Sequence, residues 1–189
     1  MEEIRFHGRG GQGTVVAAML LAKAFFRAGF EVQTFPLFGV ERRGAPVEAY
    51  LRLDSQKILV RSNIYQPDHL VIMDRKLLKT VDVKAGLKPG GWILVNAPSI
   101  AECTPVFDGF RSAVVNAVEI AVHNGLGTRT HPMVNTAVIG AFAGLLEKPS
   151  LDDIAEAIRE DIDVKTENNV KAAVEGFQRV QVHRGASDG

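Results

Sequence analysis

The chain has 189 residues, of which 46% are hydrophobic and 23% charged, as is typical of one soluble globular domain. Its 22 lysines and arginines balance its 22 aspartates and glutamates, so a general electrostatic attraction to nucleic acid or anionic membrane is not expected. The single cysteine, Cys103, excludes an internal disulfide and an iron–sulfur cluster held by this chain alone, which needs about four thiolates.

A glycine-rich turn follows the first predicted strand, residues 4–7 (IRFH). Gly8, Gly10 and Gly13 have the spacing G-x-G-x-x-G, and Gly11 is a fourth glycine in the turn. A long helix is predicted over residues 14–28, largely buried, with Gly29 as its stop. We expect its buried face to include Val15, Met19, Ala22 and Phe26, and three further residues to widen that face: Ala18, Leu21 and Phe25. Glycines let a ligand approach the backbone, and a helix start offers N–H groups to an anion.

The second predicted strand, residues 31–35 (EVQTF), argues against a dinucleotide in this turn. A dinucleotide site needs an acidic residue at the far end of that strand to hold the ribose hydroxyls, and Glu31 stands at its start. Two interpretations stay open. The turn binds a phosphate-bearing or other anionic ligand, or it is purely structural.

The loop at residues 37–46 (LFGVERRGAP) follows that second strand. Ligands of α/β sheets bind at the carboxyl ends of strands, so this loop and the glycine turn are expected at one edge. Arginine forks suit phosphate or carboxylate, although paired arginines are also common on solvated loops. The candidate binding residues are Gly8, Arg9, Gly10, Gly11, Gln12, Gly13, Arg42 and Arg43.

The middle of the chain reads as strands. Residues 47–53 alternate in hydropathy and predict an antiparallel edge or hairpin strand, and residues 57–61 (KILVR) predict a further short paired strand. Residues 69–74 and 91–96 are continuously apolar, as strands buried on both faces are, and a helix is expected at residues 77–85 between them.

The last third predicts one strand and four helices. The strand is at residues 112–117, and the helices are at 118–125, 135–147, 150–161 and 167–181. Ser150 and Asp153 form a weak capping box. Small residues line one face of the second of these helices, either for an internal helix contact or for a subunit seam: Ala137, Gly140, Ala141 and Gly144.

Strands alternating with helices predict an α/β fold: a Rossmann-like, open, mostly parallel sheet with helices on both faces and a small antiparallel edge. We expect one domain over residues 1–182 and a disordered tail at 183–189. No signal peptide or membrane span is recognisable, so a cytoplasmic location is expected.

No catalytic set or metal site is visible in the sequence. The five histidines have no metal-ligand spacing, and Asp74 either faces the ligand edge or caps the following helix. A binding edge without its own chemistry fits one subunit of a larger enzyme.

Four segments carry a resemblance to a known family. They are RFHGRGGQGTVVAAMLLAKA, QTFPLFGVERRGAPVEAYLRL, PMVNTAVIGAFAG and ENNVKAAVEGF, in this order along nearly the whole chain. Together they resemble the gamma subunit of 2-oxoacid:ferredoxin oxidoreductases. The loop at residues 37–46 resembles the pyruvate (pyruvate synthase) and branched-chain 2-oxoacid branch in particular.

The resemblance implies an enzyme that converts a 2-oxoacid, coenzyme A and oxidised ferredoxin to acyl-CoA, carbon dioxide and reduced ferredoxin. It implies alpha, beta and ferredoxin-like delta subunits that hold thiamine diphosphate, magnesium and 4Fe-4S clusters. This chain is then inactive alone and lies close to where coenzyme A enters, so the eight candidate residues would meet that substrate. The alternatives are another 2-oxoacid (2-oxoisovalerate, 2-oxoglutarate or indolepyruvate), a non-catalytic assembly subunit, or a free-standing nucleotide-binding protein.

Overall fold

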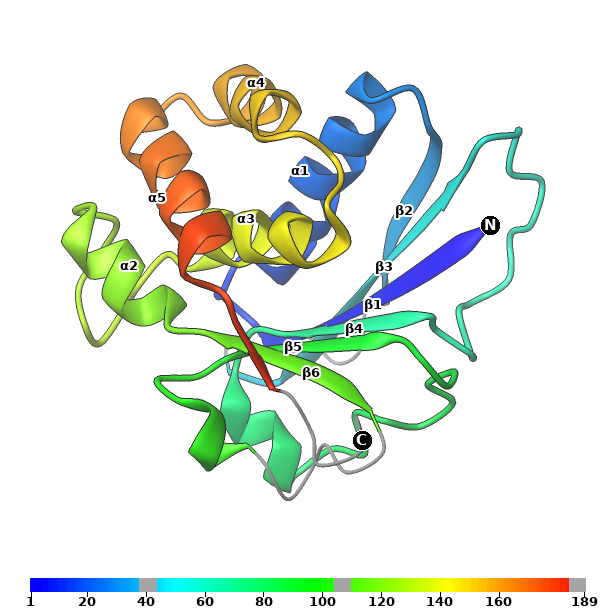
Figure 1. The fold of residues 1–189 in the computed structure, drawn as a ribbon, viewed down its shortest axis with the longest axis horizontal. Coiled ribbons are helices and arrows are strands. Elements are labelled where there is room, and N and C mark those ends of the chain that lie inside the picture. The colour runs from blue at the N-terminus through cyan, green and yellow to red at the C-terminus, as the bar shows by residue number, and fades with distance from the viewer. Residues whose placement is uncertain (38–43, 104–109, 184–189) are drawn as a thin grey trace.

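A computed structural model describes residues 1–37, 44–103 and 110–183 of the chain (Figure 1). The described residues form one seven-stranded sheet in the order β2-β3-β1-β4-β5-β6-β7. The strands are β1 (Glu2–Arg9), β2 (Glu31–Leu37), β3 (Pro46–Asp54), β4 (His69–Ile72), β5 (Trp92–Asn96), β6 (Arg111–Val115) and β7 (Gln181–His183). Strands β3 and β7 run opposite to the other five, so the sheet is mostly parallel, as predicted.

The antiparallel pairings of the sheet are β2 with β3, β3 with β1, and β6 with β7 at the far edge. The sequence predicts β3 as an edge or hairpin strand. It is a hairpin strand, but β2 lies outside it and forms the edge, because β3 pairs with β2 on one side and β1 on the other.

Three sequence predictions are wrong in this structure. Residues 57–61 belong to no strand. The helix expected at residues 77–85 is the short 3-10 helix η1 (Arg75–Lys79). His183, predicted as the start of a disordered tail, belongs to β7, while residues 184–189 lie outside the described part of the chain.

Helices cover both faces of the sheet, but unequally (Figure 1). The α-helices pack together on one face: α1 (Thr14–Arg27), α2 (Ala117–His123), α3 (Asn135–Leu146), α4 (Leu151–Asp161) and α5 (Thr166–Arg179). Helices η1 and η2 (Ile100–Glu102) lie on the other face, over a smaller apolar cluster. Alternate strand residues serve the two layers, as Val71 faces the first and Leu70 and Ile72 the second.

Helix α1 is largely buried, as predicted, but its exposed side was misplaced. Ala17, Leu21 and Phe25 are fully buried, whereas Met19 is 44% and Phe26 is 64% exposed. The helix is apolar on nearly every side, so periodicity alone could not orient it.

The small-residue stripe of α3 is an internal helix contact. A Cβ built on Gly140 would lie 1.9 Å from the carbonyl oxygen of Ala173 in α5, and one on Gly176 of α5 would lie 2.1 Å from that of Ala137. Glycines on both helices therefore let the two backbones touch. Ser150 caps α4 as predicted, since its hydroxyl accepts the Asp153 N–H at 3.1 Å.

Candidate functional site

The glycine turn joins the carboxyl end of β1 to the start of α1. Gly11 and Gly13 have φ of +91° and +74°, a backbone conformation that side chains with a Cβ rarely adopt. A Cβ on Gly8 would lie 1.9 Å from the hydroxyl of Thr14. The local backbone therefore requires glycine at these positions whatever the turn binds.

Two side chains of the turn hold it in shape from within. The Gln12 side-chain oxygen accepts the Arg9 N–H at 2.8 Å, and the Gln12 amide donates to Asp74 Oδ2 at 3.1 Å. Arg9 Nε forms an ion pair with the same Asp74 oxygen at 3.0 Å. Asp74 Oδ1 also accepts the Lys76 N–H at 2.9 Å and caps η1. Asp74 thus plays both roles that the sequence leaves open, lying at this edge and capping the next helix.

The positive charge of the turn and its available hydrogen-bond donors belong to different groups. The Arg9 charge is compensated by Asp74, and its Nη1 donates to the Gly44 carbonyl at 3.3 Å. The backbone N–H groups of Gly11 and Gly13 find no hydrogen-bond partner among residues 1–37, 44–103 and 110–183. The start of α1 can therefore donate to an anion, although Arg9 contributes little net charge.

The second loop meets the turn, as the sequence predicts. Gly10 N–H donates to the Ala45 carbonyl at 2.9 Å, and the Gly10 carbonyl accepts the Gly44 N–H at 3.2 Å. Residues 44–45 thus lie directly beside the glycine turn. Arg42 and Arg43 lie outside the described residues.

Asn135, the first residue of α3, is a site residue that the sequence analysis missed. A Cβ on Gly13 would lie 3.2 Å from the Asn135 side-chain nitrogen, and Asn135 Oδ1 accepts the Thr136 N–H at 3.1 Å. An amide donor therefore stands where the starts of α1 and α3 meet. Nothing in the local sequence places it there, because only the packing of α3 against α1 brings it to the turn.

A buried polar cluster lies beneath the turn, on the sheet face away from α1. Arg5 Nε donates to His7 Nε2 at 3.0 Å, His7 Nδ1 faces a Glu48 oxygen at 3.5 Å, and the Tyr50 hydroxyl donates to the other Glu48 oxygen at 2.6 Å. Burial lowers the pKa of His7 to about 4 and, with Glu48, raises the pKa of Tyr50. The imidazole is therefore neutral near pH 7. With His7 3% and Tyr50 4% exposed, the groups satisfy one another inside the protein.

Two features are absent from the described ranges, 1–37, 44–103 and 110–183. There, no group of three or more His, Cys, Asp or Glu side chains could hold a metal ion. None of the helices in those ranges combines the length and hydropathy needed to cross a membrane.

Comparisons with known proteins agree over almost the whole chain. The family described as pyruvate ferredoxin/flavodoxin oxidoreductase matches residues 3–179. The "Pyruvate/ketoisovalerate oxidoreductases common subunit gamma" of Thermococcus kodakarensis is 46% identical over 97% of this chain and 99% of its own. The "Pyruvate synthase subunit PorC" of Methanocaldococcus jannaschii is 45% identical over 92% and 93%. The crystal structure of the pyruvate oxidoreductase subunit PORC from Thermotoga maritima superposes with a TM-score of 0.82, at 29% identity over 97% of this chain and 98% of that one.

Proposed function

This chain belongs to the pyruvate ferredoxin/flavodoxin oxidoreductase family, and we propose that it is the gamma subunit of a multisubunit pyruvate:ferredoxin oxidoreductase in the cytoplasm. The enzyme converts pyruvate, coenzyme A and oxidised ferredoxin to acetyl-CoA, carbon dioxide and reduced ferredoxin. Alpha, beta and delta subunits complete it and hold thiamine diphosphate, magnesium and the 4Fe-4S clusters. The Thermococcus relative, named as common to pyruvate and ketoisovalerate enzymes, favours 2-oxoisovalerate as a second substrate of the assembly.

The residues of this chain support the proposal that partner chains hold the redox cofactors. Its one cysteine is fully buried, and burial raises the pKa of that thiol, so Cys103 is a poor metal ligand. The glycine turn lacks the acid of a dinucleotide site, since Glu31 begins β2 at the opposite edge from the turn. Both observations favour a subunit over a free-standing nucleotide-binding enzyme.

Within that enzyme, we assign to this chain a share in coenzyme A binding. The observation that carries this is the pair of backbone N–H groups of Gly11 and Gly13, which have no partner among the described residues, with the Asn135 amide next to Gly13. Gly44 and Ala45, which directly follow Arg42 and Arg43 in the sequence, lie at the same edge. Because Arg9 is engaged by Asp74, the positive charge for a phosphate comes from Arg42 or Arg43 in this proposal.

The chemical part of these residues is binding and orientation. Backbone N–H groups and guanidinium forks hold phosphate oxygens through charge-assisted hydrogen bonds, which fixes the direction in which the coenzyme enters. Bond making and breaking belong to the partner subunits, so the residues of this chain transfer no proton or electron.

The test is single substitution of Arg42→Ala and Arg43→Ala in the assembled enzyme. Losing a charge-assisted contact costs about 1.5–3 kcal/mol, so at least one variant should raise the KM for coenzyme A roughly ten- to a hundredfold. The KM for pyruvate should hardly move. Arg27→Ala is the matched control, because Arg27 lies at the other end of α1 from the turn.

An unchanged KM for coenzyme A in both variants, together with release of the subunit by either, would make the loop a docking element. It would also end the assignment of coenzyme A to this edge. The assembly must be checked by gel filtration in each case, because dissociation of the subunit would lower the turnover whichever substrate is varied.

A further inference from the structure

The segment between β3 and β4, residues 55–67, exposes several large apolar side chains. We call it the arm. It runs past the end of β3, at the amino edge of the sheet (Figure 1), whereas the glycine turn lies at the carboxyl edge. Its side chains Leu59, Val60 and Tyr65 are 77%, 41% and 72% exposed. Three large apolar side chains exposed within residues 59–65 favour an interaction site at this segment.

The second half of the arm is fixed to the rest of the protein although it is not in a strand. Arg52 is 1% exposed and donates from Nη2 to the Ser62 carbonyl at 2.7 Å. Ile64 is buried in the protein at 2% exposure. The Tyr65 carbonyl passes so close to Gly86 that a Cβ there would lie 2.0 Å from it. The backbone at and next to Tyr65 is therefore fixed from the inside.

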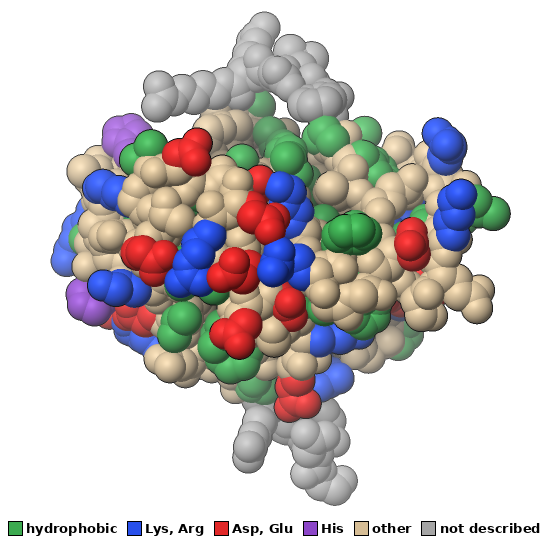
Figure 2. Space-filling view, turned by 90° about the horizontal axis from the view of Figure 1, so that it is seen from above, with side chains coloured by type: hydrophobic (Ala, Val, Ile, Leu, Met, Phe, Trp, Pro, Cys, Tyr) green, Lys and Arg blue, Asp and Glu red, His purple; other side chains and the backbone are tan. Residues whose placement is uncertain are grey.

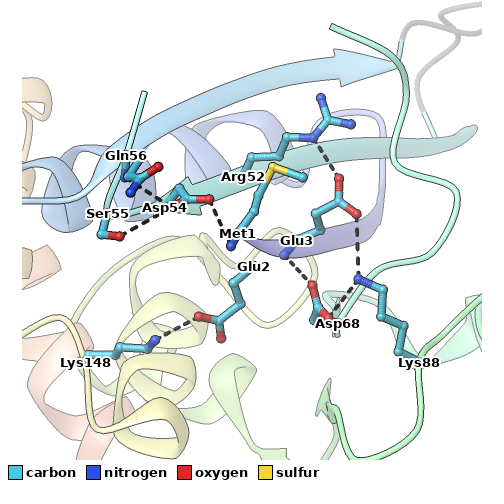
Figure 3. A network of polar contacts seen from close by, with 10 residues as sticks. All are labelled: Met1, Glu2, Glu3, Arg52, Asp54, Ser55, Gln56, Asp68, Lys88 and Lys148. Atoms are coloured by element: carbon cyan, nitrogen blue, oxygen red, sulfur yellow. Dashed lines mark hydrogen bonds and ion pairs between the residues drawn. The ribbon is translucent and has the colours of Figure 1, made fainter. Parts of the chain in front are cut away.

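Both ends of the arm are also tied down, by the polar network of Figure 3. At one end, Asp54 accepts the Gln56 N–H at 3.1 Å. At the other, Asp68 accepts the Glu3 N–H at 2.7 Å and the Lys88 ammonium at 2.9 Å. A surface fixed before binding loses little conformational entropy when a partner covers it, which is the property of a docking element.

The charge of the arm indicates the kind of partner. Lys57 and Arg61 are its only charged residues, so the arm carries two positive charges beside its apolar side chains. A second copy of this chain would have to offer acidic side chains, and the richest source is α4. Four of its five carboxylates are engaged already: Asp161 pairs with Lys23, Glu160 with Arg27 and Glu156 with Arg159, and Asp153 accepts the Ser150 hydroxyl. Figure 2 shows acidic and basic side chains lying together across this helical face.

We propose that the arm docks this chain onto a different subunit of the oxidoreductase, one that presents an apolar surface edged by carboxylates. Leu59 and Tyr65 are the apolar anchors, and Lys57 and Arg61 meet the carboxylates. Tyrosine and arginine are enriched among the residues that dominate binding at protein interfaces. The proposal rests on the proposed function for the existence of the other subunits, but not on the coenzyme A site.

The experiment measures the affinity of the purified full chain for its purified partner subunits. All of the subunits are those encoded by the same organism. Leu59→Asp combined with Tyr65→Asp should weaken association at least tenfold, while the melting temperature of the isolated chain stays unchanged. Val164→Asp is the matched control, because Val164 is equally exposed at 71% but lies beside α5. Lys57→Glu combined with Arg61→Glu should also weaken association, and more strongly at low salt.

A photo-crosslinking residue placed at position 59 gives a readout that does not depend on the folding of the aspartate variants. It should link the chain to a partner subunit. Association of the Leu59→Asp, Tyr65→Asp variant at wild-type affinity, or a crosslink between two copies of this chain, would overturn the proposal. Failure of the wild-type chain to join any such subunits would instead overturn the proposed function.

Discussion

Substitution of Gly140 by alanine tests the helix contact at the centre of the fold. The new Cβ would lie 1.9 Å from the Ala173 carbonyl oxygen, about 1.5 Å short of the 3.4 Å at which ordinary contact begins. The obstacle is backbone, which cannot rotate away, so α3 and α5 must separate. Overpacking of this kind costs about 1–3 kcal/mol, and we expect the upper end of that range.

The expected change in melting temperature follows from two opposing effects. Replacing a helical glycine by alanine gains about 1 kcal/mol of helix propensity, which leaves a net loss of about 1–2 kcal/mol. For a domain of this length, 1 kcal/mol shifts the melting temperature by about 2–4 °C. Gly140→Ala should therefore melt about 2–8 °C lower than the wild type, and Gly140→Leu lower still.

Gly144→Ala, one turn further along α3, is the matched control. Its Cβ would lie 3.0 Å from the Phe177 carbonyl oxygen, which a shift of a few tenths of an ångström relieves. The gain in helix propensity should then offset the crowding and leave the stability nearly unchanged. Thermal unfolding followed by circular dichroism compares the variants. Equal melting temperatures for the two alanine variants would show that the close approach of α3 and α5 is not what the geometry indicates.

Three further predictions concern buried polar groups. Arg52→Met removes a buried arginine whose Nε donates to Glu3 at 2.8 Å. In urea titrations the free energy of unfolding should fall by about 3–5 kcal/mol. A loss under about 1 kcal/mol would refute the role given to Arg52. The pKa of His7 falls from 6.5 to about 4 on folding, so below pH 6.5 the unfolded chain takes up a proton that the folded chain does not. Stability should therefore decline by about 3 kcal/mol between pH 6.5 and 4, and His7→Gln should abolish this slope; an unaltered slope would assign it to other groups. Cys103 is fully buried with a raised thiol pKa, so iodoacetamide should modify it only after unfolding, and rapid modification of the folded chain would contradict that burial.

Much of the fold could be predicted from local sequence. Continuous apolar runs marked β4 and β5, and alternation marked β3. Residues 57–61 have the composition of a strand, yet composition does not supply a partner. Strand β3, the nearest in sequence, already pairs with β2 and β1 and offers no free side. A segment forms a strand only beside another strand that has a free edge, and which edges are free depends on the topology of the whole sheet.

Some features of the candidate site could also be predicted from local sequence, and others could not. The glycine turn could be predicted because φ angles and close contacts leave a direct mark on the sequence, as at Gly11 and Gly13. The bond from Gln12 to Asp74 could not, since 62 residues separate the two. Asn135 reaches the turn only through helix packing. In the sequence, Asn135 looks like any other asparagine at the start of a helix, so its place at the turn is known only from the fold.

The central claim, that this chain acts only as the gamma subunit of a pyruvate:ferredoxin oxidoreductase, is tested most directly by reconstitution. The measurement is pyruvate- and coenzyme A-dependent reduction of ferredoxin or a viologen dye by the purified chain, by its partner subunits, and by the mixture. The account predicts activity in the mixture alone. Turnover by the isolated chain, or full activity of the partners without it, would contradict the account.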